Sequence, residues 1–395
     1  MTSRQIFLNH LAQTSESPLC FELNRAEDVF LYDVNDKKYI DLIGGISVCN
    51  VGHCNQEVKM AIQRQLEKYM HVMVYGELIQ SPQIQYAKAL AEHLPENLQS
   101  VYFTNSGAEA TEGAMKLAKR VTKRSKIISF KNAYHGSTQG ALSVIGSEYF
   151  QQAYRPLLPN VFMYEYGRQA AIDAIDNETA CVILEPVQSE AGVIIPANEW
   201  LQKLKQKCVE TGCLLIFDEI QSGFGRTGSL FRFTTVGVVP DILLLGKAIG
   251  GGMPLGAFIS SKENMDLFTH NPILGHITTF GGHPVSCAAG LAAFQFLLKH
   301  KLSDAALRKE KYFIQELQHP AILKINSCGL LMAVHFESYE LNKKIIDTCI
   351  SKGVFTDWFL FASNALRIVP PLTIEENEIK NASAIILEAI NEVVC

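Results

Sequence analysis

The length, composition and charge of the chain exclude several classes of protein. Its 395 residues are 48% hydrophobic, which is enough for a sizeable core and predicts two or three domains. The formal net charge is -5, and no block of like charges gives a reason to expect nucleic acid or an anionic membrane as a partner. We therefore expect a folded, soluble protein that acts on small molecules.

The cysteines and the N-terminus predict a cytoplasmic location. The ten cysteines are scattered, with no Cys-x-x-Cys pair and no Cys/His spacing typical of a metal site, so we expect reduced thiols and no metal. The first ten residues contain no apolar run long enough for a secretion signal. The longest weakly polar stretch, residues 286–298, is too short to span a bilayer and predicts a buried helix.

The first hundred residues predict a hairpin and a helix. Residues 29–37 read as a hairpin with a turn at Asn35-Asp36. The chain then passes through Gly44-Gly45 to a helix near residues 57–70.

Between about residues 100 and 260, short apolar strands alternate with amphipathic helical stretches. This alternation predicts a mainly parallel sheet that is covered on both faces. The expected strands are residues 101–104, 126–130, 180–184, 213–217, 241–245 and 256–259. Ligands of such sheets bind at the carboxyl ends of the strands, and Asn105, Glu185, Asp218 and Lys247 stand at these ends.

The last hundred residues are charged and mixed. Candidate strands at 330–336 and 365–369 and a final helix from Glu375 predict a small α+β domain. We divide the chain into an N-terminal segment that packs with the small domain, a large domain and the small domain itself. These parts span residues 1–54, 55–295 and 296–395.

Lys247 is the residue with the clearest chemical meaning. An apolar strand delivers it into the glycine-rich turn Gly246-Lys-Ala-Ile-Gly-Gly-Gly252, where an amine is poorly solvated but can form an imine. Asp218 ends another apolar strand. A pyridoxal phosphate (PLP) site requires such a pair, because the amine binds the aldehyde and the acid keeps the pyridine nitrogen protonated. Either residue alone has an ordinary structural alternative, a buried lysine that reaches outward or an acidic turn.

Three further segments supply groups that such a site needs. Residues 104–110 form a strand-to-helix junction whose backbone N–H groups and helix dipole suit a phosphate, with Ser106 as cap and phosphate ligand. An ordinary N-cap is the alternative. Tyr134 and His135 offer rings to stack on a planar cofactor, with packing as the alternative. Glu185 and Glu190 follow the next strand, where buried carboxylates are useful if they face an arginine.

In order and spacing, these segments resemble the class III, ornithine/acetylornithine-type, PLP-dependent aminotransferases of fold type I. The resemblance covers residues 29–371 and implies an α/β fold with a mainly parallel sheet of the seven-stranded type, flanked by helices, plus a small α+β domain. The matching segments are Asn105-Ser-Gly-Ala-Glu-Ala110, Tyr134-His-Gly136, Glu185-Pro-Val-Gln-Ser-Glu-Ala-Gly192, Asp218-Glu-Ile-Gln221, Gly225-Arg-Thr-Gly228, Gly246-Lys-Ala-Ile-Gly-Gly-Gly252 and Thr279-Phe-Gly-Gly282.

The resemblance also implies roles for single residues toward the cofactor. Lys247 would hold PLP and shuttle protons, Asp218 would pair with the pyridinium nitrogen, and Gln221 would bond the phenolic oxygen. The phosphate would be held by Ser106, Gly107 and Ala108, with Tyr134 stacked on the ring. Thr279 would reach the phosphate of the neighbouring subunit's cofactor, which implies a homodimer with shared active sites.

Four residues are implied to contact the substrates. Arg367 would bind the α-carboxylate of glutamate, and Glu190 would mask Arg367 when an amine enters, so that one pocket serves a ping-pong cycle. Thr278 belongs to the same set. Ser137 departs from the family, because ornithine, acetylornithine and 4-aminobutyrate enzymes usually have there an arginine that clamps the distal carboxylate. Ile46 stands where ornithine aminotransferase has a tyrosine.

The function implied is transfer of the terminal amino group of an ornithine-like, acetylornithine-like or other ω-amine donor to 2-oxoglutarate. Two alternatives share the fold, an aminomutase acting on glutamate-1-semialdehyde and a decarboxylase of the dialkylglycine type. A PLP-binding regulator without catalysis is the alternative from another class, but the sequence contains no additional DNA-binding module or basic face that would favour it.

Overall fold

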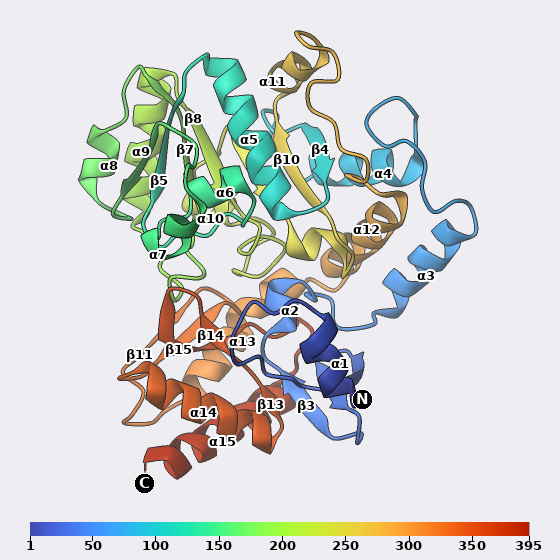
Figure 1. The fold of residues 1–395 in the computed structure, drawn as a ribbon, viewed down its shortest axis with the longest axis vertical. Helices are drawn as coiled ribbons and strands as arrows, with labels where there is room; N and C mark the ends of the chain where they lie inside the picture. Colours follow the sequence, from blue (N-terminus) through green and yellow to red (C-terminus); the bar gives the residue numbers. More distant parts are fainter. Residues whose placement is uncertain (395) are drawn as a thin grey trace.

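The structure, a computed structural model, describes residues 1–394 and contains three β-sheets (Figure 1). The largest sheet has seven strands in the order β4-β10-β9-β8-β7-β5-β6. Every neighbouring pair from β9 to β6 is parallel, and β10 is antiparallel to both of its neighbours. The strands are β4 (Ser100–Thr104), β5 (Lys126–Phe130), β6 (Val161–Tyr164), β7 (Thr179–Leu184), β8 (Leu214–Asp218), β9 (Ile242–Leu245) and β10 (Gly256–Ser260).

Alternate residues of these strands enter two separate clusters of buried side chains, as the two-residue period of a strand requires. In β7, Cys181 and Ile183 pack with helix α5 (Gly107–Thr122), while Val182 and Leu184 pack with α9 (Asn198–Thr211). Strands β7, β8 and β9 are almost entirely buried. The sheet is therefore covered on both faces, and its carboxyl ends are the free edge where side chains can meet a ligand.

Two smaller sheets lie at the other end of the molecule (Figure 1). The first has the order β1-β2-β3-β13, so the N-terminal strands share a sheet with a strand from the last fifth of the chain. The second has the order β11-β12-β15-β14. Their strands are β1 (Leu23–Glu27), β2 (Phe30–Asp33), β3 (Lys38–Asp41), β11 (Lys324–Ser327), β12 (Met332–His335), β13 (Val354–Phe355), β14 (Trp358–Phe359) and β15 (Ala362–Ile368).

The remaining helices connect and cover the sheets. Those before the large sheet are α1 (Ser3–His10), α2 (Gly44–Ser47), α3 (Gln56–Leu66) and α4 (Ser81–Ala91). Those within it are α6 (Gln139–Ser143), α7 (Glu148–Gln151), α8 (Gln169–Asp173), α10 (Arg232–Val236) and α11 (Lys262–Asp266), with the 3-10 turns η1 (Gln152–Tyr154), η2 (Lys247–Gly250) and η3 (Leu267–Thr269). The last are α12 (Pro284–Lys299), α13 (Leu302–Glu316), α14 (Tyr339–Lys352) and α15 (Glu376–Val394).

The predicted α/β class, the six expected strands of the large sheet and the N-terminal hairpin are confirmed. The helix expected near residues 57–70 is shorter, because the chain leaves the helix after Leu66 and the Gln65 side chain donates to the Tyr69 carbonyl. The domain boundaries at residues 54/55 and 295/296 stay a prediction. Within residues 1–394, no helix has the length and apolar character needed to cross a membrane.

Candidate active site

A cavity of about 500 Å³ lies at the carboxyl ends of the parallel strands. It brings together nine of the residues predicted for the site, which come from segments far apart in the sequence. These nine are Ser106, Gly107, Ala108, Tyr134, Ser137, Glu190, Asp218, Gln221 and Lys247. Their convergence gives the site its chemistry.

Lys247 enters the cavity directly after β9, at the first residue of η2. Its Nζ donates a hydrogen bond to Gln221 Oε1 at 2.8 Å. Burial lowers the pKa of Lys247 below its ordinary value, although Glu190 partly opposes this effect by favouring the charged form. A lysine with a lowered pKa has a larger share of neutral amine, which is the nucleophilic form.

Asp218 and His135 form a buried pair at the floor of the cavity. The Asp218 Oδ2 lies 2.6 Å from the His135 Nδ1, and the other carboxylate oxygen accepts from the Ile220 N–H. Asp218 is 3% exposed. A carboxylate held by two donors keeps one orientation, so Asp218 presents a fixed negative charge to whatever occupies the cavity.

Residues Ser106 to Ala108 form the N-terminus of helix α5 and line the cavity. Ser106 is the N-cap, and its Oγ accepts from the Glu109 N–H. N–H groups in the first turn of a helix have no acceptor within the helix, so those of Gly107 and Ala108 can bind an anion. A methyl group on Gly107 would lie 2.7 Å from the Ile220 side chain, so the close approach of this loop requires glycine.

Two buried nitrogen atoms lining the cavity have no hydrogen-bond partner among residues 1–394. They are His135 Nε2 and Gln221 Nε2. Because unpaired buried polar atoms are costly, these atoms indicate a missing polar ligand. The residues fit PLP: an amine for its aldehyde, a carboxylate for its ring nitrogen, an amide for its phenolic oxygen and a helix N-terminus for its phosphate.

Tyr134 and Glu185 also line the cavity. The buried Glu185 carboxylate accepts from the N–H groups of Tyr134 and Ser189. Burial raises the pKa of Glu185 to about 7. The Tyr134 hydroxyl lies 3.1 Å from the Ser137 Oγ. Ser137 therefore contributes a short neutral side chain to the cavity lining.

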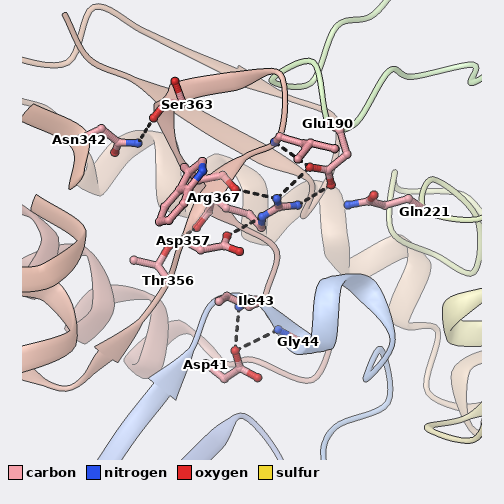
Figure 2. A network of polar contacts seen from close by, with 12 residues as sticks. Asp41, Ile43, Gly44, Glu190, Gln221, Asn342, Thr356, Asp357, Ser363 and Arg367 are labelled. Atoms are coloured by element: carbon pink, nitrogen blue, oxygen red, sulfur yellow. Dashed lines mark hydrogen bonds and ion pairs between the residues drawn. The ribbon is translucent and has the colours of Figure 1, made fainter. Parts of the chain in front are cut away.

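Glu190 lines the cavity and Arg367 does not. The Arg367 guanidinium instead contacts the Glu190 carboxylate, as Figure 2 shows. Its two terminal nitrogens donate to the two Glu190 oxygens at 2.8 and 3.0 Å, which makes a bidentate pair. Burial alone would raise the pKa of Glu190, but Arg367 outweighs it and lowers the pKa to about 2. Arg367 is 2% exposed, so Glu190 covers a cation that would otherwise face the cavity.

Arg367 also has a second acidic partner that sequence reasoning missed. The Arg367 Nε donates to Asp357 Oδ1 at 2.6 Å, on a different side of the guanidinium from Glu190 (Figure 2). Burial raises the pKa of Asp357, while Arg367 acts in the opposite direction. No local pattern marks Asp357 in the sequence, because the pairing of β14 with β15 creates this contact.

Thr278 and Thr279 lie away from this cavity. The Thr278 Oγ1 accepts from the side-chain amide of Asn105 and from the Gly281 N–H, and Thr278 lines a neighbouring cavity. Thr279 is exposed. The contact of Thr279 with a neighbouring subunit's cofactor therefore stays a prediction.

Comparison with known proteins agrees with a PLP site. The family model described as "Aminotransferase class-III" matches residues 11–390. Acetylornithine aminotransferase of Methanopyrus kandleri is 39% identical over 369 residues, 92% of each chain. Putrescine aminotransferase of Pectobacterium atrosepticum is 37% identical over 366 residues, 88% of this chain and 77% of that one.

A solved structure agrees with these relatives. Ornithine aminotransferase of Toxoplasma gondii, with partial occupancy of PLP at its active site, superposes with a TM-score of 0.91 at 28% identity, over 99% of this chain and 93% of that chain. This chain belongs to the class III aminotransferases and is a PLP-dependent enzyme of fold type I. The predicted family, fold, enzyme class and cofactor are confirmed.

Proposed function

We propose that this aminotransferase transfers the terminal amino group of an ω-amine donor to 2-oxoglutarate in a ping-pong cycle. The relatives support a terminal amine as the donor, since their names specify acetylornithine, putrescine and ornithine. The observation that carries the proposal is the bidentate pair of Glu190 and Arg367 beside the cavity. A cation that is covered by a movable carboxylate can serve two unlike substrates in turn.

We assign each residue of the cavity a role toward the cofactor. When bound, PLP supplies an aldehyde that takes up an amine and a ring that accepts electrons. We assign attachment of PLP and proton transfer to the Nζ of Lys247, and the proton of the ring nitrogen to the carboxylate of Asp218. The Gln221 amide, whose Nε2 has no hydrogen-bond partner among residues 1–394, would donate to the phenolic oxygen. Ser106, Gly107 and Ala108 would hold the phosphate, and Tyr134 would stack on the ring.

The charges around the cavity favour amine donors without a distal carboxylate. Lys247 is the only lysine or arginine among the described side chains that line the cavity, because Arg367 lies behind Glu190. Ser137 offers only a hydroxyl at the position where the resemblance to the family leads us to expect an arginine. A diamine or another donor with an uncharged or cationic distal end therefore fits this lining better than a donor with a distal carboxylate. Thr278 lines a neighbouring cavity, so its contact with a substrate stays a prediction.

We further propose a homodimer in the cytoplasm. Large apolar side chains are exposed around Thr279 and in the segment before α4, among them Ile79 at 91%, Met70 at 66% and Phe280 at 54% exposure. Such a surface is unusual for a soluble monomer, and a second copy would cover it. Thr279 would then reach the partner's cofactor, so Thr279→Ala should weaken PLP retention. Light scattering that finds a monomer with full PLP occupancy would contradict this assembly.

The test of the proposed function times the two half-reactions separately by stopped-flow absorbance of the bound cofactor. A panel of diamines, monoamines, ornithine and acetylornithine identifies the donor, and formation of glutamate from 2-oxoglutarate identifies the acceptor. Arg367→Ala should slow the half-reaction with 2-oxoglutarate far more than that with a diamine, because only the acceptor has a carboxylate beside the reacting carbon. Equal effects on both would contradict the proposal, and carbon dioxide release or turnover without an acceptor would favour the decarboxylase or the aminomutase.

A further inference from the structure

The guanidinium of Arg367 is shared between two carboxylates that occupy different sides of it (Figure 2). Glu190 takes the end-on edge, where the two terminal nitrogens lie. Asp357 takes the Nε–H, and the Trp358 carbonyl accepts a second bond from the Nη2. The Arg367 side chain also lies over the Phe359 ring, 4.3 Å from its centre. The side of Arg367 away from Glu190 is thus fully engaged.

Backbone contacts tie the segment of Asp357 to the strand of Arg367, whereas Glu190 follows a strand of the large sheet. The Arg367 N–H donates to the Asp357 carbonyl, and the Thr356 hydroxyl donates to the Arg367 carbonyl at 2.6 Å. These bonds tie the segment before β14 to β15. Glu190 instead follows β7 of the large sheet and meets the small sheet through bonds from the N–H groups of Leu360 and Phe361. Glu190 can therefore leave Arg367 without any change in the contact of Arg367 with Asp357.

We propose that Asp357 is a specificity-determining residue. It is the permanent counter-ion of Arg367, and it weakens the binding of every carboxylate to the end-on edge of the guanidinium. This inference rests on the proposed function, in which Glu190 and the acceptor's carboxylate use that edge in turn. Asp357 faces the guanidinium from the β13–β14 turn and Glu190 faces it from the β7 loop. With both bound, one cation has two anions, so each anion is held less tightly than by a lone arginine.

This arrangement lowers the cost of releasing Glu190. A buried guanidinium that loses its only carboxylate is left as an uncompensated charge, which is strongly unfavourable. With Asp357 in place, Arg367 stays paired when Glu190 moves away. Asp357 thus lowers the affinity of Arg367 for the acceptor's carboxylate and at the same time makes the release of Glu190 from Arg367 less costly.

The test is a double-mutant cycle with Asp357→Asn and Glu190→Gln. Both amides can still accept hydrogen bonds from Arg367, so the variants remove charge and keep the contacts. The Asp357 side chain is 30% exposed, which leaves room to solvate the new NH₂ group. The measured quantity is the apparent Kd for 2-oxoglutarate, from the concentration dependence of its half-reaction. Asp347→Asn is the matched control, since Asp347 is an exposed acid paired with Lys343.

We expect Asp357→Asn to have a small effect when Glu190 is present and a large effect in the Glu190→Gln background. With Glu190 present, Asp357→Asn strengthens the binding of both Glu190 and the acceptor to Arg367. Because the two compete for the same edge, the apparent Kd for 2-oxoglutarate changes by less than about threefold. In the Glu190→Gln background only the acceptor gains, and Asp357→Asn should tighten binding by about tenfold. Asp357→Ser, which also lacks the charge, should change the Kd in the same direction. All effects of the control variant Asp347→Asn on the apparent Kd should stay within about twofold of its parent in each background.

Two results would overturn the inference. One is an effect of Asp357→Asn that is the same in both backgrounds, which would indicate a structural role. The other is no tightening in the Glu190→Gln background. If Arg367→Ala also leaves the 2-oxoglutarate half-reaction intact, the proposed role of Arg367 fails together with the inference. If Arg367→Ala weakens it and Asp357→Asn does not act, only the inference fails.

Discussion

The Nδ1 of His135 lies 2.6 Å from the Oδ2 of Asp218, and both side chains are buried beneath the proposed cofactor site. Asp218 is the last residue of β8, and His135 lies in the segment after β5. An imidazole in this position holds the carboxylate in one orientation. The pair therefore suits a group that must keep a ring nitrogen protonated through a catalytic cycle.

Asp218→Asn should retain the fold and PLP but lose activity by about 100-fold or more, because a neutral amide cannot stabilise the protonated ring nitrogen. The amide oxygen can still accept from the Ile220 N–H, which preserves the local turn. Steady-state rates and thermal melting of the same samples separate catalysis from stability. Near-normal transamination by this variant would remove Asp218 from the proposed mechanism.

Gly107→Ala should weaken PLP retention by about tenfold or more, since its methyl group would meet the Ile220 side chain and displace the phosphate loop. Gly250→Ala is the control, because its added methyl would lie at an ordinary 3.4 Å from Leu255. Bound PLP after dialysis is read from its absorbance. If both variants retain PLP equally well, the close packing at Gly107 does not shape the phosphate site.

Ser137→Arg should improve the use of donors with a distal carboxylate, such as ornithine or acetylornithine, by a factor on the order of ten. The reason is that one charge-assisted pair would replace a hydroxyl at the cavity mouth. Donors without a carboxylate should gain nothing, and kcat/KM across the donor panel gives the comparison. Efficient use of acetylornithine by the native enzyme, made worse by the arginine, would show that another residue holds that carboxylate.

The pair of His53 and Asp41 predicts a pH dependence of stability. Their side chains lie 2.7 Å apart, and although burial lowers the pKa of His53, the bond to Asp41 prevails and raises it from 6.5 to about 10. A raised pKa stabilises the fold fully below pH 6.5, and this contribution is lost as the pH rises toward 10. Between pH 6 and 9.5, the native protein should lose about 1–3 kcal/mol more unfolding free energy than His53→Gln. Urea titrations at several pH values measure this free energy. Equal losses in the native protein and in His53→Gln would contradict the assigned role of His53.

The sequence was most informative where a strand is buried and ends in a polar residue. The runs before Asp218 and Lys247 are wholly apolar, so their strands and the direction of the following residues could be predicted. Strand β6 was not predicted, although Val161–Tyr164 is a short apolar run. It lies at the edge of the sheet, where its side chains are only partly buried.

Contacts that depend on the pairing of distant segments could not be predicted. Asp357 meets Arg367 only because β14 and β15 form a short irregular hairpin, and no residue spacing signals that register. The same holds for His135 Nε2 and Gln221 Nε2, whose lack of a hydrogen-bond partner among residues 1–394 is apparent only in the folded structure. In both cases the local sequence supplies the residue type, and the tertiary fold determines its surroundings.

The most direct test of the central claim is the absorbance of the bound cofactor in native enzyme and in Lys247→Ala. The native protein should show a PLP band that shifts when a diamine is added and returns when 2-oxoglutarate follows. Lys247→Ala should keep the fold yet lose turnover by several orders of magnitude, because it lacks both the attachment point and the proton carrier. A native protein without an amine-dependent shift, or a variant that turns over normally, would contradict the account.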